Sequence, residues 1–375
     1  ETNMKKISSA ILLIAFIAFI NCKSNAGEVS TNDPEKEFYQ SIIKLGNGFL
    51  DVFTSFGGLV ADAFGLKADP KKSEVQKYFN SIATKLETTI SSLASLPKEN
   101  GGGTKDQPGK DTANNTGSAV ESAIKEISEK LKAIAEAAKK AAGAAGSDET
   151  SIGNVVNAGG AGAGGGAADT NSVKGIANGM KAIVDAAEKA AGAGKEEKKE
   201  LLKAAGDGAA TGTDNAGAGH LFSGANGAGQ GASDAQAQKA AGAINAVSGE
   251  QILKEIVDAA KNGGAGAGAA AAEATNPISA AIGAAAQGGA FGNGMDQNSK
   301  VAAAIVLRGM AKDGKFAVNN DNQKDGVKSA VESGVNKTIL ALTGIVKEAV
   351  DAGLKTIVTA VKGASDAGAG AAHRK

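Results

Sequence analysis

The chain has 375 residues, and its 40 basic and 40 acidic side chains leave no net charge at pH 7. This balance provides no field that would draw the chain to nucleic acid, so it argues against a nucleic-acid partner. A single cysteine excludes an intramolecular disulfide and a cysteine-rich metal site. The 53 glycines and the abundant alanines each bury little apolar area, and they predict helices joined by long loops.

The N-terminal segment has the pattern of a secretion signal. Lys5 and Lys6 precede an apolar run centred on residues 11–20. About ten strongly apolar residues are too few to cross a bilayer, but they match the apolar region of a signal peptide. We therefore predict a signal peptide over residues 1–21, in which residues 1–3 are an extension upstream of the initiator Met4.

Cys22 directly follows this apolar run, and a polar stretch begins at Lys23. A cysteine at the cleavage point can carry a thioether-linked diacylglycerol and become an acylated N-terminus, and two or three acyl chains hold a protein stably on a membrane. The alternative is an ordinary secretion signal in which the cysteine has no role. We predict that Cys22 is the lipid attachment site and that residues 22–33 form a lipidated tether.

Beyond the tether, apolar residues recur every three or four positions, which is the spacing of amphipathic helices. The predicted helices cover residues 38–56, 73–96, 118–138, 172–191, 248–260, a short segment from 277, and 331–358. Their predicted starts are the capping boxes Ser73–Gln76, Ser118–Glu121 and Ser248–Gln251, and a proline at the first helical position in Asn276-Pro277. No stretch alternates persistently as a strand would, so the predicted fold class is all-α.

Stretches rich in Gly, Ala, Asn and Asp separate these helices, at residues 100–117, 143–171, 205–232, 262–275 and 287–299. They contain turn residues and almost no large apolar side chains, so we predict that they are exposed loops. Six of the nine phenylalanines that follow the signal lie within residues 38–79. We therefore expect the two ends of the chain to build the main core and the middle to pack lightly.

One internal segment differs from its surroundings. The sequence KVAAAIVLRGMAKDGKFAV, residues 300–318, places apolar residues around nearly the whole circumference of a helix. A helix of this kind is usually buried. The predicted buried side chains of this segment are Val301, Ile305, Leu307, Met310 and Phe316.

Few residues could carry catalysis or bind a metal ion. The two histidines, His220 and His373, are too few for a histidine zinc site, and no nucleophile motif lies near His220. Residues 321–332 partly match a calcium-binding loop, but Gln323 and Lys328 depart from that pattern. We predict no metal site, no cofactor and no catalytic residues, and an anchored hydrolase is the least favoured function.

Four motifs resemble one known family. They are MKKISSAILLIAFIAFINCKS at residues 4–24, EFYQSIIKLGNGFLDVFTSFGGLVADAFG at 37–65, VSGEQIL at 247–253 and RGMAKDGKFAV at 308–318. The chain resembles, over essentially its full length, the variable surface lipoproteins of Borrelia spirochaetes, which include the variable large proteins. The resemblance implies an elongated, all-helical outer-membrane lipoprotein, a single domain over residues 34–375, with both termini towards the membrane and long Gly/Ala-rich loops at the far end.

The resemblance also implies how such a protein works. A central cassette, here about Glu121 to Asp325, would be rewritten by gene conversion from silent copies, so that host antibodies lose their epitopes. Residues Met295–Val318 would match the immunodominant invariable segment of the family. The partners implied are outer-membrane lipid, through acylated Cys22, and host antibodies.

Two functions of different classes therefore remain. The first is an antigenically variable shield without catalysis. The second is an adhesin that binds a host matrix or plasma protein, for which a basic or apolar exposed patch would be the signature. The charges in this sequence are dispersed, which favours the shield. Weak pairing of two copies through the Phe-rich helices is compatible with either function.

Overall fold

The computed structural model describes residues 69–94, 110–158, 164–192, 201–202, 212–224, 231–262, 266–284, 288–292 and 294–372. At residues 110–118 and 361–372 it describes the backbone alone. The predicted helix at 38–56, the signal segment, Cys22 and His373 lie outside these ranges.

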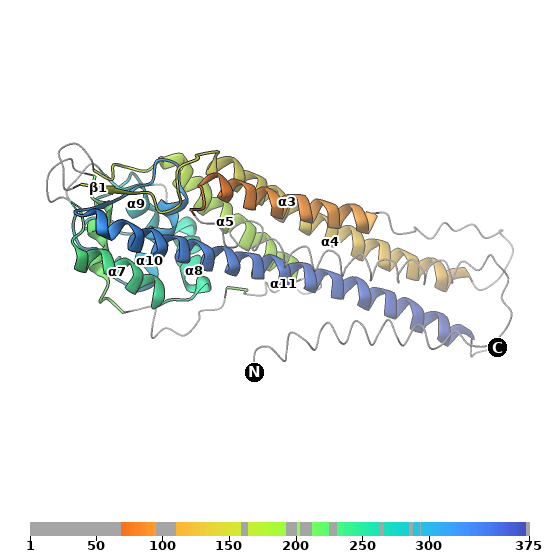
Figure 1. Cartoon of the computed structure of the whole chain (residues 1–375). Coiled ribbons are helices and arrows are strands. Elements are labelled where there is room, and N and C mark those ends of the chain that lie inside the picture. Colours follow the sequence, from red (N-terminus) through yellow and green to blue (C-terminus); the bar gives the residue numbers. More distant parts are fainter. Residues whose placement is uncertain are drawn as a thin grey trace.

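Four long helices run along one axis and give the molecule its elongated shape (Figure 1). They are α3 (Ser73–Ala94), α4 (Lys110–Ala145), α5 (Thr170–Ala191) and α11 (Lys324–Ala372). Shorter elements gather at one end, which we call the head (residues 146–169 and 212–323): β1 (Val155–Asn157), η1 (Ala216–Phe222), α7 (Asp234–Asn245), α8 (Gly249–Lys261), α9 (Pro277–Ile282), α10 (Asn298–Met310), β2 (Phe316–Val318) and η2 (Asp321–Gln323). The all-α prediction is confirmed.

Local signals explain several helix starts. Ser248 and Gln251 form the predicted capping box of α8, and Pro277 begins α9 after the side chain of Asn276 accepts a hydrogen bond from the Ser279 N–H. Both patterns satisfy N–H groups that a helix leaves without a partner. The signals placed these two starts correctly.

Two other predicted caps are wrong. The Ser73 hydroxyl is buried without a hydrogen-bond partner, and the backbone N–H of Ser73 instead donates to the Asp148 carbonyl, at 2.8 Å. Tertiary contact thus replaces the capping box of α3. Ser118 lies inside α4, which already begins at Lys110, so residues 110–117 are helical and not a loop.

Small residues allow α4 and α5 to pack closely. A Cβ atom at Gly175 would lie 2.2 Å from the Cβ atom of Ala144, and one at Gly179 would lie 2.4 Å from that of Ala141. Real carbon atoms do not approach this closely, so only glycine fits at either position. Part of the glycine and alanine content therefore serves helix packing and not loops.

A short pair of parallel strands crosses the head, which the sequence did not predict. In β1 and β2, Val155 pairs with Phe316, Val156 with Ala317 and Asn157 with Val318. Three residues are too few for the alternation that marks a strand in a sequence.

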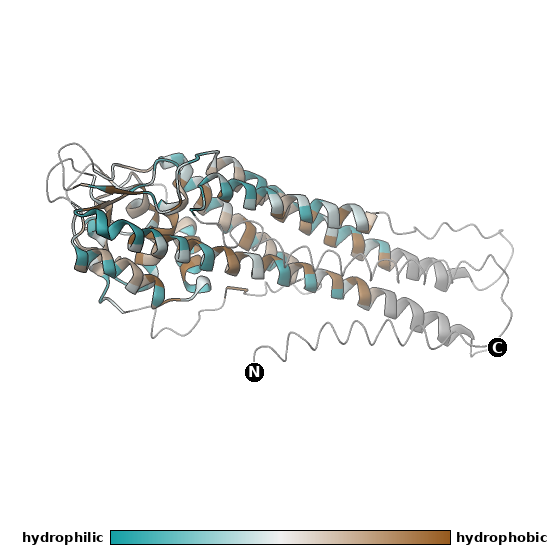
Figure 2. Cartoon of the chain, in the orientation of Figure 1, coloured by the Kyte–Doolittle hydropathy of each residue, from teal (hydrophilic) through white to brown (hydrophobic). Residues whose placement is uncertain are grey.

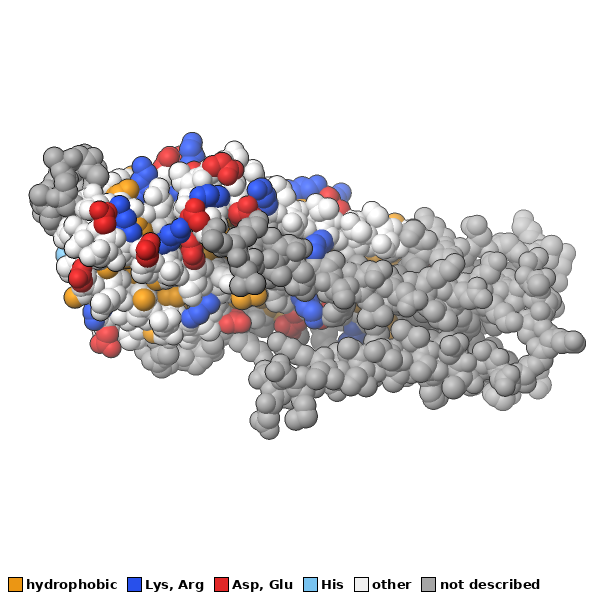
Figure 3. All heavy atoms as spheres, in the orientation of Figure 1, with side chains coloured by type: hydrophobic (Ala, Val, Ile, Leu, Met, Phe, Trp, Pro, Cys, Tyr) orange, Lys and Arg blue, Asp and Glu red, His pale blue; other side chains and the backbone are white. Residues whose placement is uncertain are grey.

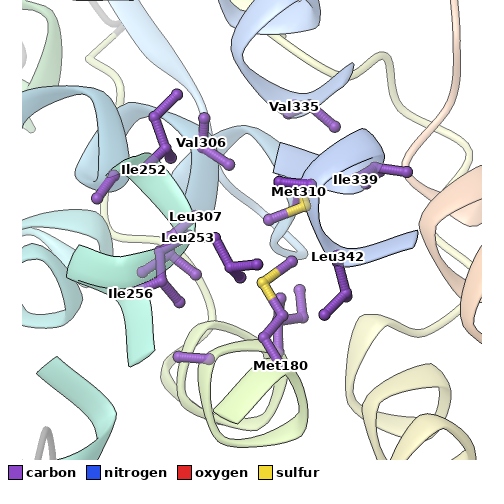
Figure 4. Close-up of a cluster of buried hydrophobic side chains, with 14 of the residues drawn as sticks. Met180, Ile252, Leu253, Ile256, Val306, Leu307, Met310, Val335, Ile339 and Leu342 are labelled. Carbon is purple, nitrogen blue, oxygen red and sulfur yellow. The ribbon is translucent and has the colours of Figure 1, made fainter. Parts of the chain in front are cut away.

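Hydrophobic and hydrophilic residues alternate along the helices (Figure 2). Almost all buried apolar side chains of the described residues form one continuous core cluster. Side chains of α5, α8, α10 and α11 converge on one part of it, which includes Met180, Leu253, Leu307 and Met310 (Figure 4). Of the six phenylalanines at 38–79, Phe79 is fully buried and the other five lie outside the described residues.

The middle of the chain is packed more fully than predicted. Within the stretches expected to be exposed loops, many side chains are buried: Ala145, Ile152, Ala158, Ala168, Ala218, Leu221, Phe222, Ala271, Ala274, Phe291 and Met295. The prediction of exposure is wrong at these positions, because small side chains and isolated large ones fill the narrow spaces between head elements. Other positions of the same stretches are exposed, such as Glu149 and Glu273. In the part of the chain described here, no helix is long and apolar enough to cross a membrane.

Candidate functional site: the head and its buried segment

The centre of the head is the segment 300–318, which we call the buried segment. Every side chain from Val301 to Met310 is buried, and α10 is thus enclosed on all sides. The five side chains singled out from the sequence, Val301, Ile305, Leu307, Met310 and Phe316, have no exposed surface. The apolar contacts of α10 with α8 and α11 are drawn in Figure 4.

Arg308 is the largest fully buried side chain among the described residues, and it lies within the buried segment. Its guanidinium binds only backbone carbonyls: Nε donates to Lys315 at 2.6 Å, Nη1 donates to Ala281 at 3.0 Å and Ile282 at 3.3 Å, and Nη2 donates to Gly166. Burial lowers the pKa of Arg308 to about 10, so the side chain stays charged at neutral pH. Its charge is therefore stabilised by carbonyl dipoles from three places, which are the loop at Gly166, the last turn of α9 and the turn before β2.

Phe222 packs against this arginine. The Arg308 Cζ atom lies 5.2 Å from the centre of the Phe222 ring, within the range of a cation–π contact. The edges of Phe291 and Phe316 also meet Phe222, with ring centres 5.2 Å and 5.6 Å away. No role was predicted for Phe222 from the sequence. An isolated aromatic residue in a Gly/Ala-rich stretch is a signal that could have indicated its burial.

Lys72 contacts the turn between α10 and β2, at Gly314. Its ammonium is fully buried, donates to the Gly314 carbonyl at 2.7 Å and lies 3.7 Å from the Asp148 carboxylate. Burial lowers the pKa of Lys72 to about 8, and the negative charge of Asp148 partly opposes this. The nearby residues Lys71 and Glu74 are also charged, so the sequence contained no sign that Lys72 is buried.

The low pKa of Lys72 predicts a change of stability with pH. Between about pH 8 and pH 10.5 the unfolded chain holds a proton on Lys72 that the folded chain has lost, so the free energy of unfolding rises with pH across this window. The rise amounts to about 3 kcal/mol at most, at 1.36 kcal/mol per pKa unit. We expect it in the difference between urea unfolding curves of the wild type and Lys72→Met, measured from pH 7 to 11. A difference that is flat or falls with pH would contradict the assignment.

The exposed surface of the head mixes positive and negative side chains (Figure 3). Pairs of opposite charge lie one helical turn apart, such as Lys254 with Asp258 and Lys261 with Asp258 on α8. Among the described residues, the large apolar side chain that stands exposed is Leu340 on α11, with about half of its surface accessible, 49%. A surface of this kind is typical of one that faces water.

The residues considered for metal binding and catalysis do not converge. In the near-match to a calcium loop, Asp321 pairs with Lys324, and Lys328 lies 2.5 Å from Asp69. The part of the chain that the structure describes holds no group of three or more side chains arranged to bind a metal ion. His220 is half-buried in η1, and burial lowers its pKa.

The fold and this site define an elongated helical protein whose head encloses one apolar segment and presents a mixed polar surface. A family model described as Borrelia lipoprotein matches residues 49–361. The chain belongs to this family. The resemblance predicted from the sequence motifs is thereby confirmed.

Individual relatives agree with the family. Variable large protein 4 of Borrelia hermsii is 35% identical over 360 residues, which cover 94% of this chain and 92% of that protein. Variable large protein 17 of the same organism is 33% identical over 343 residues, covering 90% and 87%. The crystal structure of the Lyme disease variable surface antigen VlsE of Borrelia burgdorferi is similar with a TM-score of 0.69 and 46% identity, covering 88% of this chain and 100% of that one. Because VlsE is a variable surface antigen, this similarity supports a role of the chain as a surface antigen.

Proposed function

We propose that the chain is an outer-membrane lipoprotein of the cell surface whose head is an antigenically variable shield against host antibodies. The observation that supports this most is the division within the head. The buried segment occupies its centre, whereas charged side chains such as Glu149 and Glu273 are exposed on its surface. Surface side chains can change at little cost in stability, usually within about 0.5 kcal/mol, so such a surface can be rewritten while the core persists.

The proposal includes the domain plan predicted from the sequence. Residues 1–21 are the signal peptide, residues 22–33 the lipidated tether and residues 34–375 one helical domain, with a variable cassette at about 121–325. Residues Met295–Val318 are the counterpart of the invariable segment of the family. The C-terminal end of α11 lies opposite the head, which is consistent with a head that faces away from the membrane (Figure 1).

Sequencing clones recovered from an immune host tests the shield. We expect changes confined to residues 121–325 and concentrated at exposed positions, with the buried segment unchanged. An unaltered middle would contradict the shield and favour the adhesin. Clones passaged in a host without an immune response provide the control, because no antibodies select for altered epitopes there.

Labelling with radioactive palmitate tests the anchor separately. We expect Cys22→Ser to lose the label and the membrane association together, whereas Ser24→Ala, two residues further on, keeps both. Retention of label in Cys22→Ser would refute lipid attachment at this residue.

A further inference from the structure

We propose that the buried segment and its continuation to Asn319 hold the Gly/Ala-rich loops of the head mainly through main-chain atoms, so that exposed loop side chains can be replaced without loss of the fold. This inference rests on the proposed function, because it explains how one core accepts many surfaces. It concerns the contacts of residues 308–319 with loops near residues 154–168, 231–232 and 281–283.

Backbone hydrogen bonds join the end of this segment to two loops. Some of them belong to the parallel pairing of β1 with β2. On the other edge of β2, a single parallel bridge joins Val318 to Ala232. The bonds are Phe316 N–H to Asn154 O at 2.9 Å, Ala158 N–H to Val318 O at 2.7 Å, Ala232 N–H to Ala317 O at 2.9 Å and Asn319 N–H to Ala232 O at 3.0 Å. Every residue except proline carries both groups, so these bonds do not depend on which side chains the loops bear.

The turn before β2 is held in the same way. The Asp169 N–H donates to the Lys312 carbonyl at 2.9 Å. The neighbouring Ala168 N–H donates to the Ile282 carbonyl at 2.8 Å, which joins this loop to the end of α9. The Arg308 guanidinium contacts the carbonyls of both, at Gly166 and at Ala281 and Ile282. A buried cation that binds carbonyls recognises the path of the backbone and not its sequence.

Lys337 of α11 repeats this arrangement at another place. Its ammonium donates to the carbonyl of Ile244 at 2.8 Å and to that of Val247 at 3.1 Å, at the C-terminal end of α7. Cations are favourable at this end of a helix, where carbonyls lack partners. Lys337 lies outside the proposed cassette, whereas α7 lies inside it, so here too a constant residue would contact variable sequence through its backbone.

Main-chain contact imposes one strict condition, which is small size. A Cβ atom at Gly231 would lie 2.6 Å from the Val318 backbone, and one at Gly165 would lie 2.8 Å from the Ser223 carbonyl. The side chains of Ala158, Ala168 and Ala232 are buried at the same contacts. The Gly/Ala-rich composition of these loops therefore follows from the close approach of two backbones.

Some side chains do contact the segment and should resist change, such as Phe222, described above, and Asp148, whose Oδ2 accepts a hydrogen bond from the Asp313 N–H at 3.4 Å. Asn319 Oδ1 accepts a hydrogen bond from the Gly231 N–H at 2.9 Å, and Ser172 Oγ accepts one from the Lys312 N–H at 3.1 Å. Exposed neighbours such as Glu149, Ala167 and Glu273 are free of this constraint.

Melting temperatures of full-chain variants test the inference. A triple variant, Glu149→Lys with Ala167→Glu and Glu273→Lys, changes exposed side chains only, and we expect it to melt within about 3 °C of the wild type. Gly231→Ala adds a single methyl group at a main-chain contact. We expect it to melt more than about 5 °C lower and to speed hydrogen exchange of the Ala232 amide at least about tenfold.

The matched control is Gly143→Ala. Gly143 is exposed on α4, and a Cβ atom there would meet no atom within 4 Å, so the substitution should keep or slightly raise the melting temperature. A triple variant that melts as low as Gly231→Ala would overturn the inference, as would a Gly231→Ala variant that melts with the wild type. Neither result depends on immune selection, so failure of this inference can be told from failure of the shield.

Discussion

Replacing Arg308 with methionine is expected to lower the free energy of unfolding by about 3 kcal/mol. The change removes the donor for the carbonyls of Gly166, Ala281, Ile282 and Lys315. Hydrogen bonds to a charged donor contribute about 1.5–3 kcal/mol each, so four of them contribute at least about 6 kcal/mol. Methionine also removes the cost of burying a cation. The lowered pKa of Arg308 corresponds to a cost of about 3 kcal/mol. The lost hydrogen bonds outweigh this relief.

Arg308→Lys is the control that separates charge from geometry. It keeps the positive charge, but one ammonium cannot reach all four carbonyls, so we expect an intermediate loss of about 2 kcal/mol. Urea unfolding followed by circular dichroism measures both variants, and hydrogen exchange at the Ala168 amide locates the change in the head. A methionine variant as stable as the wild type would show that Arg308 is not a support of the loops.

Short-range signals were sufficient for most of the helical framework. The periodic stripes predicted helices that match α3, α5, α8 and α11, because one face of each must be apolar to pack against its neighbours. The start of α8 was predictable because both partners of its capping box lie within four residues. The burial of α10 was equally visible, since its apolar residues leave no polar face.

Long-range contacts explain what could not be predicted. Alanine and glycine look alike in an exposed loop and in a tight helix contact, so the close packing of Gly175 and Gly179 against α4 could not be predicted. The helix α7 did have a local signal, because Ser233 and Gln236 form a capping box at its start, but that signal was overlooked. The three-residue strands form only because residues 161 positions apart, Val155 and Phe316, meet in the fold. The partners of Arg308 are carbonyl oxygens, which have no signature in a sequence.

Replacing Phe316 with alanine is the second large change that we expect, with a loss of about 3–5 kcal/mol in the free energy of unfolding. The Phe316 ring is fully buried and lies at 90° to the Phe222 ring in an edge-to-face contact, with ring centres 5.6 Å apart. Its removal leaves a cavity beside Phe222, which also packs on Phe291 and Arg308. The backbone bond from Phe316 to Asn154 should survive, because alanine keeps the same N–H group.

Phe316→Leu separates lost volume from lost aromatic contact. Leucine fills most of the space and should cost less than about 2 kcal/mol, the range of swaps that nearly conserve volume. The double variant with Phe222→Ala then measures the pair itself, and we expect the two single losses to overlap by about 0.5–1.5 kcal/mol, since an edge-to-face pair contributes about that much beyond its buried area. Strictly additive losses would mean that the two rings fill space independently. The aromatic cluster would then support the head as bulk alone, and any large apolar residue would serve at position 316.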